Sequence, residues 1–200
     1  MKKAAILLVF LGVVLVMSAL FLFWKNQRRI GQAKKNADRI LQELLQEIPE
    51  EPEEYTVVYR EMKKVVIDGD EYIGYLSIPS LNRKIPVMAE WECDWEKSIP
   101  GRYSGSIYTD NLVIAGYMYV HHFGGSGPLN IGTEVDFTDM ENYTQHYRVT
   151  AIEKLQSDIA MQPGTWDMTL FTCAFGGEEK YVVRCVLDSR SDEEKTAISE

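Results

Sequence analysis

The feature that most constrains this chain is an uncharged apolar run near its start, Ala4–Trp24. About 20 helical residues cross the hydrocarbon core of a bilayer, so a run of this length predicts a transmembrane helix. Two lysines precede the run, as in a secretory signal peptide, but signal peptides usually have only ~7–15 apolar residues. We therefore expect a cytoplasmic tip and an uncleaved signal-anchor over residues 1–24, with cleavage near Ser18–Ala19 as the alternative.

The charges that flank this run conflict with the orientation that we expect. Positive charges concentrate on the cytoplasmic side of a membrane helix, and more of them follow the run than precede it. The basic residues after the run are Lys25, Arg28, Arg29, Lys34 and Lys35. Taken alone, this count favours a cytoplasmic C-terminal part.

The segment after the apolar run shows helical periodicity. Apolar residues recur at helical spacing at Ile30, Ala33, Ala37, Ile40, Leu41, Leu44, Leu45 and Ile48. The pattern predicts an amphipathic juxtamembrane helix, and the proline- and glutamate-rich segment Pro49–Glu54 ends it, so that residues 25–54 form a helix and an acidic linker. The helix either packs against its own domain or serves as a stalk; a helix for a membrane surface or a partner is the alternative.

From about residue 55 the pattern changes to short β-branched and aromatic runs separated by turn residues, which is typical of an all-β barrel or sandwich. The predicted strands cover Tyr72–Ile78, Ile85–Met88, Leu112–Ala115, Thr133–Phe137, Tyr147–Ile152, Met168–Thr172 and Tyr181–Leu187. Seven or eight strands can close into a small barrel, filled by alternate residues such as Val182 and Val186 or their neighbours. We expect this domain over residues 55–190 and a disordered acidic tail over residues 191–200.

Composition excludes several classes of protein. A net charge of −9 argues against nucleic-acid binding, which needs a basic surface to neutralise phosphates. The three cysteines form no C-x-x-C pair, and the acidic residues around Trp91–Trp95 lack the spacing of a calcium loop. The sequence therefore indicates no metal site and no cofactor.

The segment that bears most directly on chemistry is Thr169–Cys173, a predicted strand that ends in a cysteine and precedes a glycine-containing turn. A cysteine at the mouth of a strand is well placed for nucleophilic attack. A lone cysteine is, however, more often a small buried apolar residue. The residues alone leave both interpretations open.

The Thr169–Cys173 segment resembles the Thr-Leu-x-Thr-Cys signature of sortases, the cysteine transpeptidases of Gram-positive cell envelopes. Three further segments resemble sortase strands in the order of that family: Ile73–Pro79, Ile85–Val87 and Asn111–Gly116. The resemblance extends over about Tyr72 to Leu187. It implies a mainly β fold, a closed barrel of about eight strands with short helices, and a cell-membrane protein of single-pass topology whose C-terminal domain is extracellular.

The resemblance implies that Cys173 is the nucleophile, but two other catalytic positions differ. The residue after the Ala-Gly pair is a histidine in sortases and is Tyr117 here. A phenol, with a pKa of about 10, is a poor substitute for imidazolium as a proton donor near neutral pH. His121 and His122 follow closely and are alternative acid–base residues, or a pair of solvated loop histidines; His146 is expected to be a strand-entry residue.

The second difference is at the position of the sortase arginine, which Lys180 occupies, with Arg184 four residues later. Strand alternation places Lys180, Val182 and Arg184 on one face. Lys180 is expected nearest to Cys173, and Arg184 about 13 Å farther along at ~3.3 Å per residue. Lysine supplies a point charge without the planar fork of arginine, yet it can lower the pKa of a thiol.

Structural roles are expected for the remaining cysteines and for the tryptophans. A disulfide between Cys93 and Cys185 is possible outside the cell, although spacing alone cannot establish it. Trp91, Trp95 and Trp166 are expected to cover the barrel or its groove, and an exposed aromatic groove for a peptide is the alternative.

These residues lead to two hypotheses about function. In the first, the Cys173 thiolate attacks the sorting signal of a surface protein to give a thioacyl intermediate, which an amine of a cell-wall precursor or pilin resolves. Lys180, helped by Arg184, stabilises the oxyanion, Tyr117 donates a hydrogen bond, and Thr172 positions the substrate. In the second, a catalytically impaired sortase homologue binds a peptide or an envelope partner; a stalk that dimerises through the juxtamembrane helix is a weaker third idea.

Overall fold

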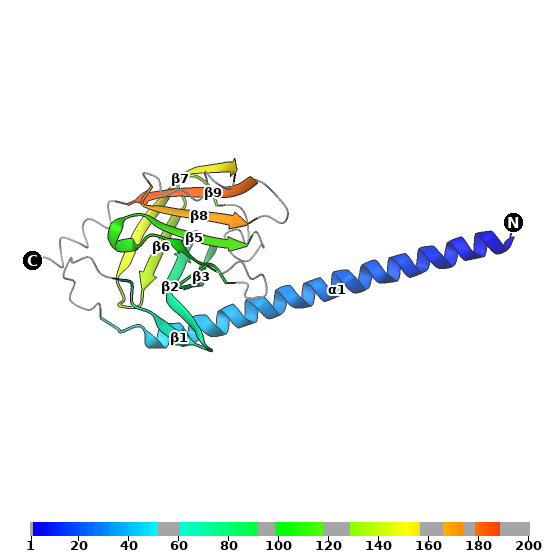
Figure 1. Cartoon of the computed structure of the whole chain (residues 1–200), viewed down its shortest axis with the longest axis horizontal. Helices are drawn as coiled ribbons and strands as arrows, with labels where there is room; N and C mark the ends of the chain where they lie inside the picture. The colour runs from blue at the N-terminus through cyan, green and yellow to red at the C-terminus, as the bar shows by residue number, and fades with distance from the viewer. Residues whose placement is uncertain are drawn as a thin grey trace, which may run out of the picture. The chain divides into compact units, whose positions relative to one another are not determined.

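The structure, a computed structural model, describes residues 2–51, 61–91, 99–117, 129–156, 166–173 and 179–188. The described chain forms one long helix, nine strands and two short 3-10 helices (Figure 1). The strands are β1 Val65–Ile67, β2 Asp70–Ile78, β3 Arg83–Met88, β4 Gly101–Ser104, β5 Leu112–Tyr117, β6 Glu134–Asp139, β7 Thr144–Gln156, β8 Met168–Cys173 and β9 Glu179–Leu187. The 3-10 helices are Pro79–Leu81 and Ile107–Thr109. By compactness the chain divides into two units, residues 1–36 and 37–200.

The N-terminal helix α1, Lys2–Glu47, continues without a break past the end of the apolar run at Trp24. Its described apolar side chains, from Phe10 (67% exposed) to Trp24 (50%), have no protein core around them. The helix is long and apolar enough to cross a membrane. The sequence therefore predicted the apolar helix correctly, although the transmembrane and juxtamembrane segments belong to one helix.

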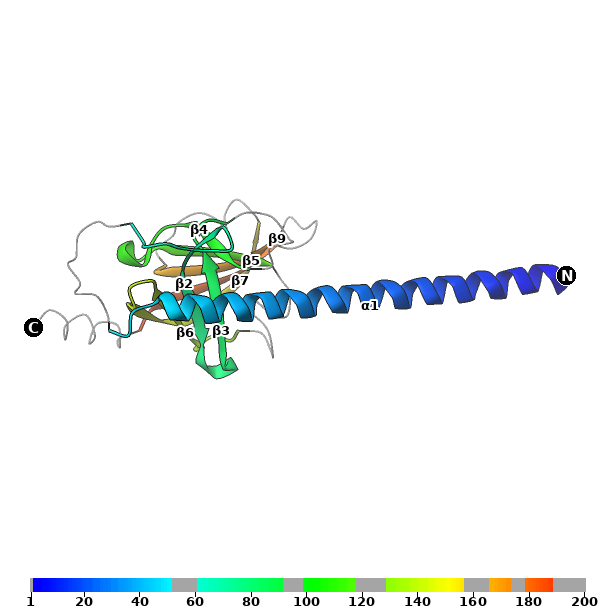
Figure 2. The ribbon, with the colours of Figure 1, turned by 90° about the horizontal axis from the view of Figure 1, so that it is seen from below.

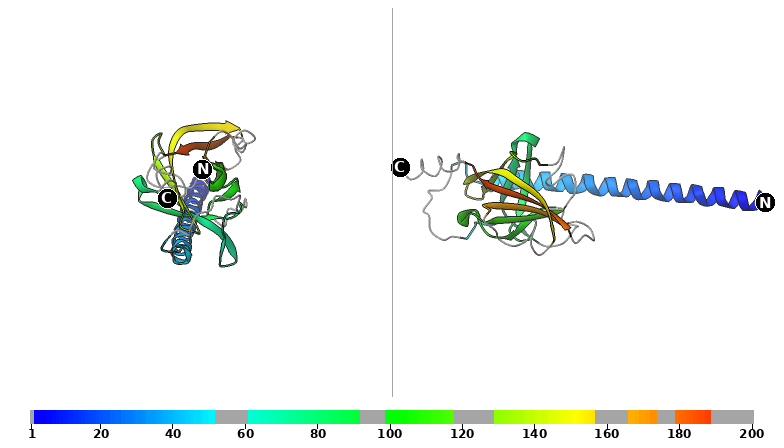
Figure 3. Two further views of the ribbon diagram at one scale, coloured as in Figure 1. Left: turned by 90° about the vertical axis from the view of Figure 1, so that its left-hand side faces the viewer. Right: turned by 90° about the horizontal axis from the view of Figure 1, so that it is seen from above.

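The strands of the second unit form a closed barrel, seen from two further sides in Figure 3. Their order is β2-β3-β4-β5-β8-β9-β7-β6, and β6 pairs with β2, so eight strands close the ring while β1 extends the β1–β2 hairpin. The pairs β3–β4 and β5–β8 are parallel, and the other pairs are antiparallel. This confirms the predicted mainly β fold with a closed barrel of about eight strands.

A glycine allows β2 to serve as the closing strand. The first residues of β2, up to Tyr72, pair with β1, and the residues from Gly74 onward pair with β6. A bulge between Tyr72 and Gly74 separates the two parts. Gly74 has a φ of 143°, and a Cβ there would lie 2.0 Å from the carbonyl oxygen of Thr138. Only glycine tolerates both that backbone conformation and that close approach.

The barrel interior is filled by alternate residues of the strands. The main core cluster takes Leu112 and Ile114 from β5, Leu170 from β8 and Cys185 from β9, with Val183 packed against it. In β9 the core residues are thus the neighbours of the two valines that we named: Val182 is fully buried but on the opposite, outward face. The outward face of β5, β8 and β9 therefore has a second apolar cluster, which bears on the site below.

The last turns of α1, from Ala37 onward, pack against the barrel (Figure 2). Ile40 (3% exposed) and Leu44 (0%) are buried in a cluster with Tyr72 of β2, Met88 of β3 and Met140. Arg39 adds an ion pair with Asp68. This part of the juxtamembrane helix therefore packs against its own domain, one of the alternatives that the sequence left open.

Candidate functional site

The candidate site lies where the parallel strands β5 and β8 end together. Their register runs without a shift from Leu112 opposite Met168 to Tyr117 opposite Cys173. Neighbouring strands lie about 4.8 Å apart, so these two positions, which are distant in sequence, become adjacent at one end of the barrel. Only the backbones of Tyr117 and Cys173 are described, and the register alone sets their proximity.

Lys180 lies at the same end of the barrel, because β9 pairs with β8 in a hairpin. Thr172 pairs with Tyr181, so Cys173 and Lys180 are the next residues toward the connection that joins the two strands of this hairpin. The Nζ atom of Lys180 lies 4.9 Å from the centre of the Phe171 ring, in a cation–π contact. The cation is thereby held over the residue two positions before Cys173 on the same strand.

Arg184 lies at a different place along β9, opposite Thr169. Its side chain is 5% exposed; Nη1 donates a hydrogen bond to Thr169 Oγ1 at 3.0 Å, and Nε lies 3.4 Å from the Glu153 carboxylate. These contacts join β9 to its neighbours β8 and β7. Arg184 is thus four residues from Lys180 on the strand, as expected, and its side chain is bound within the sheet.

An apolar surface lies between Arg184 and the strand ends. Its residues are Val113, Ala115, Phe171 and Val182, all at most 3% exposed, with Trp91 and Leu155 packed against them. Tyr103 also lies against this surface, because its ring meets that of Phe171 edge-on with centroids 5.4 Å apart. By strand alternation this is the face that Tyr117, Cys173 and Lys180 share.

A pocket opens beside this apolar surface, lined by Ala89, Glu90, Trp91, Arg102, Tyr103 and Ser104. Arg102 stabilises its wall, since Nε donates a hydrogen bond of 2.9 Å to the carbonyl oxygen of Ala89. The hydroxyl of Ser104 is buried without a hydrogen-bond partner. A buried hydroxyl of this kind favours a ligand that brings its own hydrogen-bonding group.

Thr172, which precedes Cys173, has a second unpartnered hydroxyl. Its side chain is 9% exposed, and its Oγ1 has no hydrogen-bond partner. In the register of β5 and β8 it lies opposite Gly116. By strand alternation Thr172 follows Leu170 on the inward face, whereas position 173 follows Phe171 on the outward face.

The other candidate residues divide into described and undescribed positions. His121, His122, Cys93 and Trp95 lie outside the described residues, as does the expected acidic tail. His146 is the third residue of β7, and its Nδ1 lies 2.8 Å from Oδ1 of Asp136 on β6. No group of three potential metal-ligating side chains occurs among the residues that the structure describes.

Cys185 is a free thiol in the barrel core, so a disulfide with Cys93 is not formed. It lies on the inward face of β9 and is 0% exposed, among the apolar side chains of the main core cluster. Burial raises the pKa of this thiol to about 12, because the interior does not solvate a thiolate. Cys185 is therefore a structural residue.

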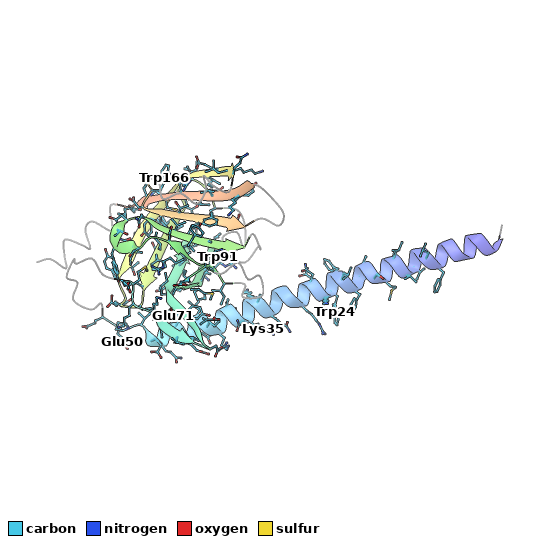
Figure 4. All side chains as sticks on the ribbon, viewed as in Figure 1. Trp24, Lys35, Glu50, Glu71, Trp91 and Trp166 are labelled. Carbon is cyan, nitrogen blue, oxygen red and sulfur yellow. The ribbon has the colours of Figure 1, made fainter. Side chains whose placement is uncertain are left out.

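Two tryptophans belong to different ends of the barrel (Figure 4). Trp91 packs against the apolar surface and lines the pocket, whereas Trp166 directly precedes β8 at the end away from Cys173. Sequence patterns did not indicate Tyr103 as a site residue. The signal that existed was a single aromatic residue in a short strand, and such residues are common in cores.

The fold and the site define a closed-barrel protein with a cysteine where two parallel strands end. The chain belongs to the sortase family, because a profile of the sortase domain matches residues 76–188, more than half of its length. These limits agree closely with the span of the resemblance found in the sequence.

Several solved sortase structures are similar to this chain. The sortase D5 transpeptidase of Clostridium perfringens shares 19% identity at a TM-score of 0.54, over 76% of this chain and 98% of that one. Sortase C from Clostridium perfringens SM101 shares 21% identity at a TM-score of 0.47, over 80% and 90%. Sortase A of Listeria monocytogenes shares 17% at 0.48, over 58% and 87%. No curated protein sequence matches this chain.

Proposed function

We propose that this chain is a sortase-type cysteine transpeptidase that cleaves the sorting signal of surface proteins through a thioacyl intermediate on Cys173. The observation that carries the proposal is the β5–β8 register, which sets position 117 beside Cys173, with Lys180 at the adjoining end of β9. Positions 117, 173 and 180, which carry a phenol, a thiol and an ammonium group, thus come together at one end of the barrel.

The reaction consists of two acyl transfers. The Cys173 thiolate attacks a backbone carbonyl carbon, forming a C–S bond and an oxyanion. When the oxyanion collapses, the C–N bond breaks and the departing amine takes up a proton. An amine of a cell-wall precursor or a pilin then attacks the thioester, forms the new amide and releases the thiolate.

Each neighbouring residue has a role in this proposal. Lys180 stabilises negative charge on the oxygen and on the thiolate. Tyr117 donates a hydrogen bond, and Thr172 helps to position the substrate at the end of β8. Arg184, bound to Thr169 and Glu153, helps indirectly by fixing β9 against β8. His121 or His122 is the alternative acid–base residue.

The surface beside Cys173 suits an extended peptide. The pocket beside Trp91 and Tyr103, with Arg102 in its wall, lies next to the buried apolar cluster around Phe171 and Val182. A strand-like peptide places alternate side chains in such a pocket and forms backbone hydrogen bonds beside it. A sorting-signal peptide is therefore the proposed ligand.

The N-terminal helix gives the proposal its location. We infer that α1 is a single-pass anchor in the cell membrane and that the barrel lies on the extracellular side, where surface proteins and acceptor amines meet. This orientation follows from the sortase family and opposes the count of positive charges after the apolar run.

A second function has its own supporting observation, the pair of Tyr117 and Lys180 where sortases have histidine and arginine. A module with these residues would bind a sorting-signal-like peptide or an envelope partner on the same apolar surface without cleaving it. The contact between Lys180 and Phe171 favours this alternative, because a cation held on an aromatic ring is less free to follow a reacting oxygen.

A trapping experiment distinguishes the two functions. The full chain in detergent is incubated with a library of sorting-signal peptides and hydroxylamine, and intact-protein mass spectrometry follows acyl adducts and hydroxamate products. Transpeptidation predicts an adduct on Cys173 that hydroxylamine removes and that Cys173→Ser lacks, whereas Cys185→Ala retains it. Peptide binding with no adduct and no hydroxamate would assign the chain to the non-catalytic alternative.

A further inference from the structure

The first 36 residues have a charge opposite to that of the rest of the chain. Residues 1–36 contain seven Lys and Arg and no Asp or Glu, so the remaining residues carry a net charge of −16 (−9 minus +7). A net acidic domain is repelled by an anionic membrane, whereas a basic segment beside an apolar helix is attracted to it. Net positive charge is therefore found in the first 36 residues, on both sides of the apolar run, and the rest of the chain is net negative.

The basic residues nearest the apolar run form a stripe that continues an aromatic row on one face of α1. The Phe21 and Trp24 rings lie 6.4 Å apart, and the Arg28 guanidinium lies 3.6 Å from the centre of the Trp24 ring. Lys25, Arg28 and Arg29 follow at helical spacings of three and four residues. Lys25 and Arg28 are exposed and form no ion pair with any described residue. We call Lys25, Arg28 and Arg29 the basic collar.

Helix geometry places the basic collar at headgroup depth if the apolar run spans the bilayer. Tryptophan prefers the membrane–water interface, so Trp24 marks the boundary of the hydrocarbon. At 1.5 Å per residue the collar lies within about 8 Å of Trp24, close to the ~5–8 Å thickness of one headgroup layer. Helical side chains also point toward the N-terminus, which here is toward the membrane.

Lys34 and Lys35 lie outside this layer. They are 15 Å or more beyond Trp24 by the same rise of about 1.5 Å per residue. Beyond a headgroup layer of ~5–8 Å this leaves them about 7–10 Å outside it, roughly one Debye length at physiological ionic strength, so screening weakens their interaction with lipid phosphates. Both side chains are exposed on the same helix, and they provide a matched control.

We propose that the basic collar is a binding site for anionic phospholipid headgroups in the leaflet on the barrel side of the span. Arginine offers a planar pair of donors to a phosphate, and the ring of Trp24 holds Arg28 in place. The proposal rests on the proposed membrane span. It explains why positive charges follow the apolar run even though the barrel is placed outside, because these charges bind lipid there.

Native mass spectrometry of the full chain tests this site. The protein in mild detergent is mixed with equal amounts of phosphatidylglycerol and phosphatidylcholine, and bound lipids of each kind are counted. The wild type should bind phosphatidylglycerol in preference by at least about threefold, the effect of one or more headgroup contacts. Lys25→Gln/Arg28→Gln/Arg29→Gln should bring the ratio close to one, and Lys34→Gln/Lys35→Gln should leave most of the preference.

Three results would overturn the lipid site. These are no preference in the wild type, an equal loss of preference in both variants, and a preference that excess inorganic phosphate removes completely, which would indicate a phosphate site. Extraction of cell membranes with alkaline carbonate separates this failure from that of the anchor. If carbonate releases the chain, the helix does not span the membrane, and the proposals of the span and of the lipid site are both refuted. If the chain stays in the membrane but shows no preference for phosphatidylglycerol, only the lipid site is refuted.

Discussion

At the scale of single residues, the substitution most relevant to rate is Tyr117. Its backbone lies beside that of Cys173, and the resemblance to sortases predicts a histidine at this position. An imidazole at this position can transfer a proton near neutral pH, and positioned acid–base groups contribute ~10²–10⁴-fold. We therefore expect Tyr117→His to raise the rate of hydroxamate formation from a sorting-signal peptide by at least about tenfold.

Tyr117→Phe is the control for this experiment, because it removes the hydroxyl without adding a base. Loss of rate in Tyr117→Phe together with a gain in Tyr117→His would assign proton handling to this position. An unchanged rate in both variants would contradict the role proposed for Tyr117.

Cys185 gives a prediction about pH. Burial raises the pKa of its thiol from 9.0 to about 12, so the folded state keeps a proton that the unfolded state releases. The contribution of the thiol to stability is complete below pH 9 and is lost as the pH rises from 9 toward 12, by about 1.4 kcal/mol at pH 10. Urea unfolding at pH 8 and pH 10 should show a smaller decrease in unfolding free energy in Cys185→Ala than in the wild type.

A decrease of equal size in the two proteins would contradict this prediction. The comparison between variants is needed because lysines and tyrosines also titrate in this range. Cys185 should, in addition, stay unmodified by iodoacetamide at pH 8 until the protein is unfolded, since a buried and protonated thiol does not react.

The candidate site residues came from the resemblance of short segments to sortases, and their roles stay predictions. The register agrees with that resemblance in bringing positions 117, 173 and 180 to the same end of the barrel. Tyr103 and Lys180 both contact the ring of Phe171, and these contacts depend on which strands are neighbours in the barrel. The periodicity of one segment does not predict the order of the strands.

At the scale of elements, the last turns of α1 can be tested through two adjacent leucines. Leu44 is fully buried against the barrel, whereas Leu45, next to it, is 39% exposed. Loss of a buried leucine costs about 2–5 kcal/mol, through lost burial and the cavity that remains. Leu44→Ala should therefore lower the unfolding free energy by that amount in urea titration, and Leu45→Ala by less than about 1 kcal/mol.

Equal effects of the two leucine substitutions would contradict the packing of the helix on the barrel. Both substitutions remove the same atoms from the same helix, so differences in helix propensity cancel. The comparison therefore measures burial alone.

Strand prediction succeeded where the strands are long and regular. The seven predicted strands all occur in the barrel; some of their ends coincide with the prediction, and the others shift by one to four residues. The prediction missed β1 and β4, which have three and four residues. β4 joins β3 through one parallel bridge, Met88 to Gly101, so its strand conformation is imposed by its neighbours and leaves little trace in its own sequence.

At the scale of the whole molecule, the orientation in the membrane is open to a direct measurement. The sortase family favours an extracellular barrel, and the positive charges that follow the apolar run favour the opposite. We expect the first, so alkaline phosphatase fused after residue 188 should be active and a fluorescent protein fused at the same point should not fluoresce. The reverse pattern would refute both the orientation and the proposed access to surface proteins.

The parallel pairing of β5 with β8 also bears on the order in which the molecule is completed during folding. Parallel neighbours cannot be joined by a tight turn, so β6 and β7 must be made, and the chain must return, before position 117 gains Cys173 as its neighbour. Contacts between such distant segments form late and slowly. A chain whose synthesis has not yet reached β8 therefore lacks this pair of neighbouring positions, and the proposed reactive centre forms only after β8 has been added beside β5.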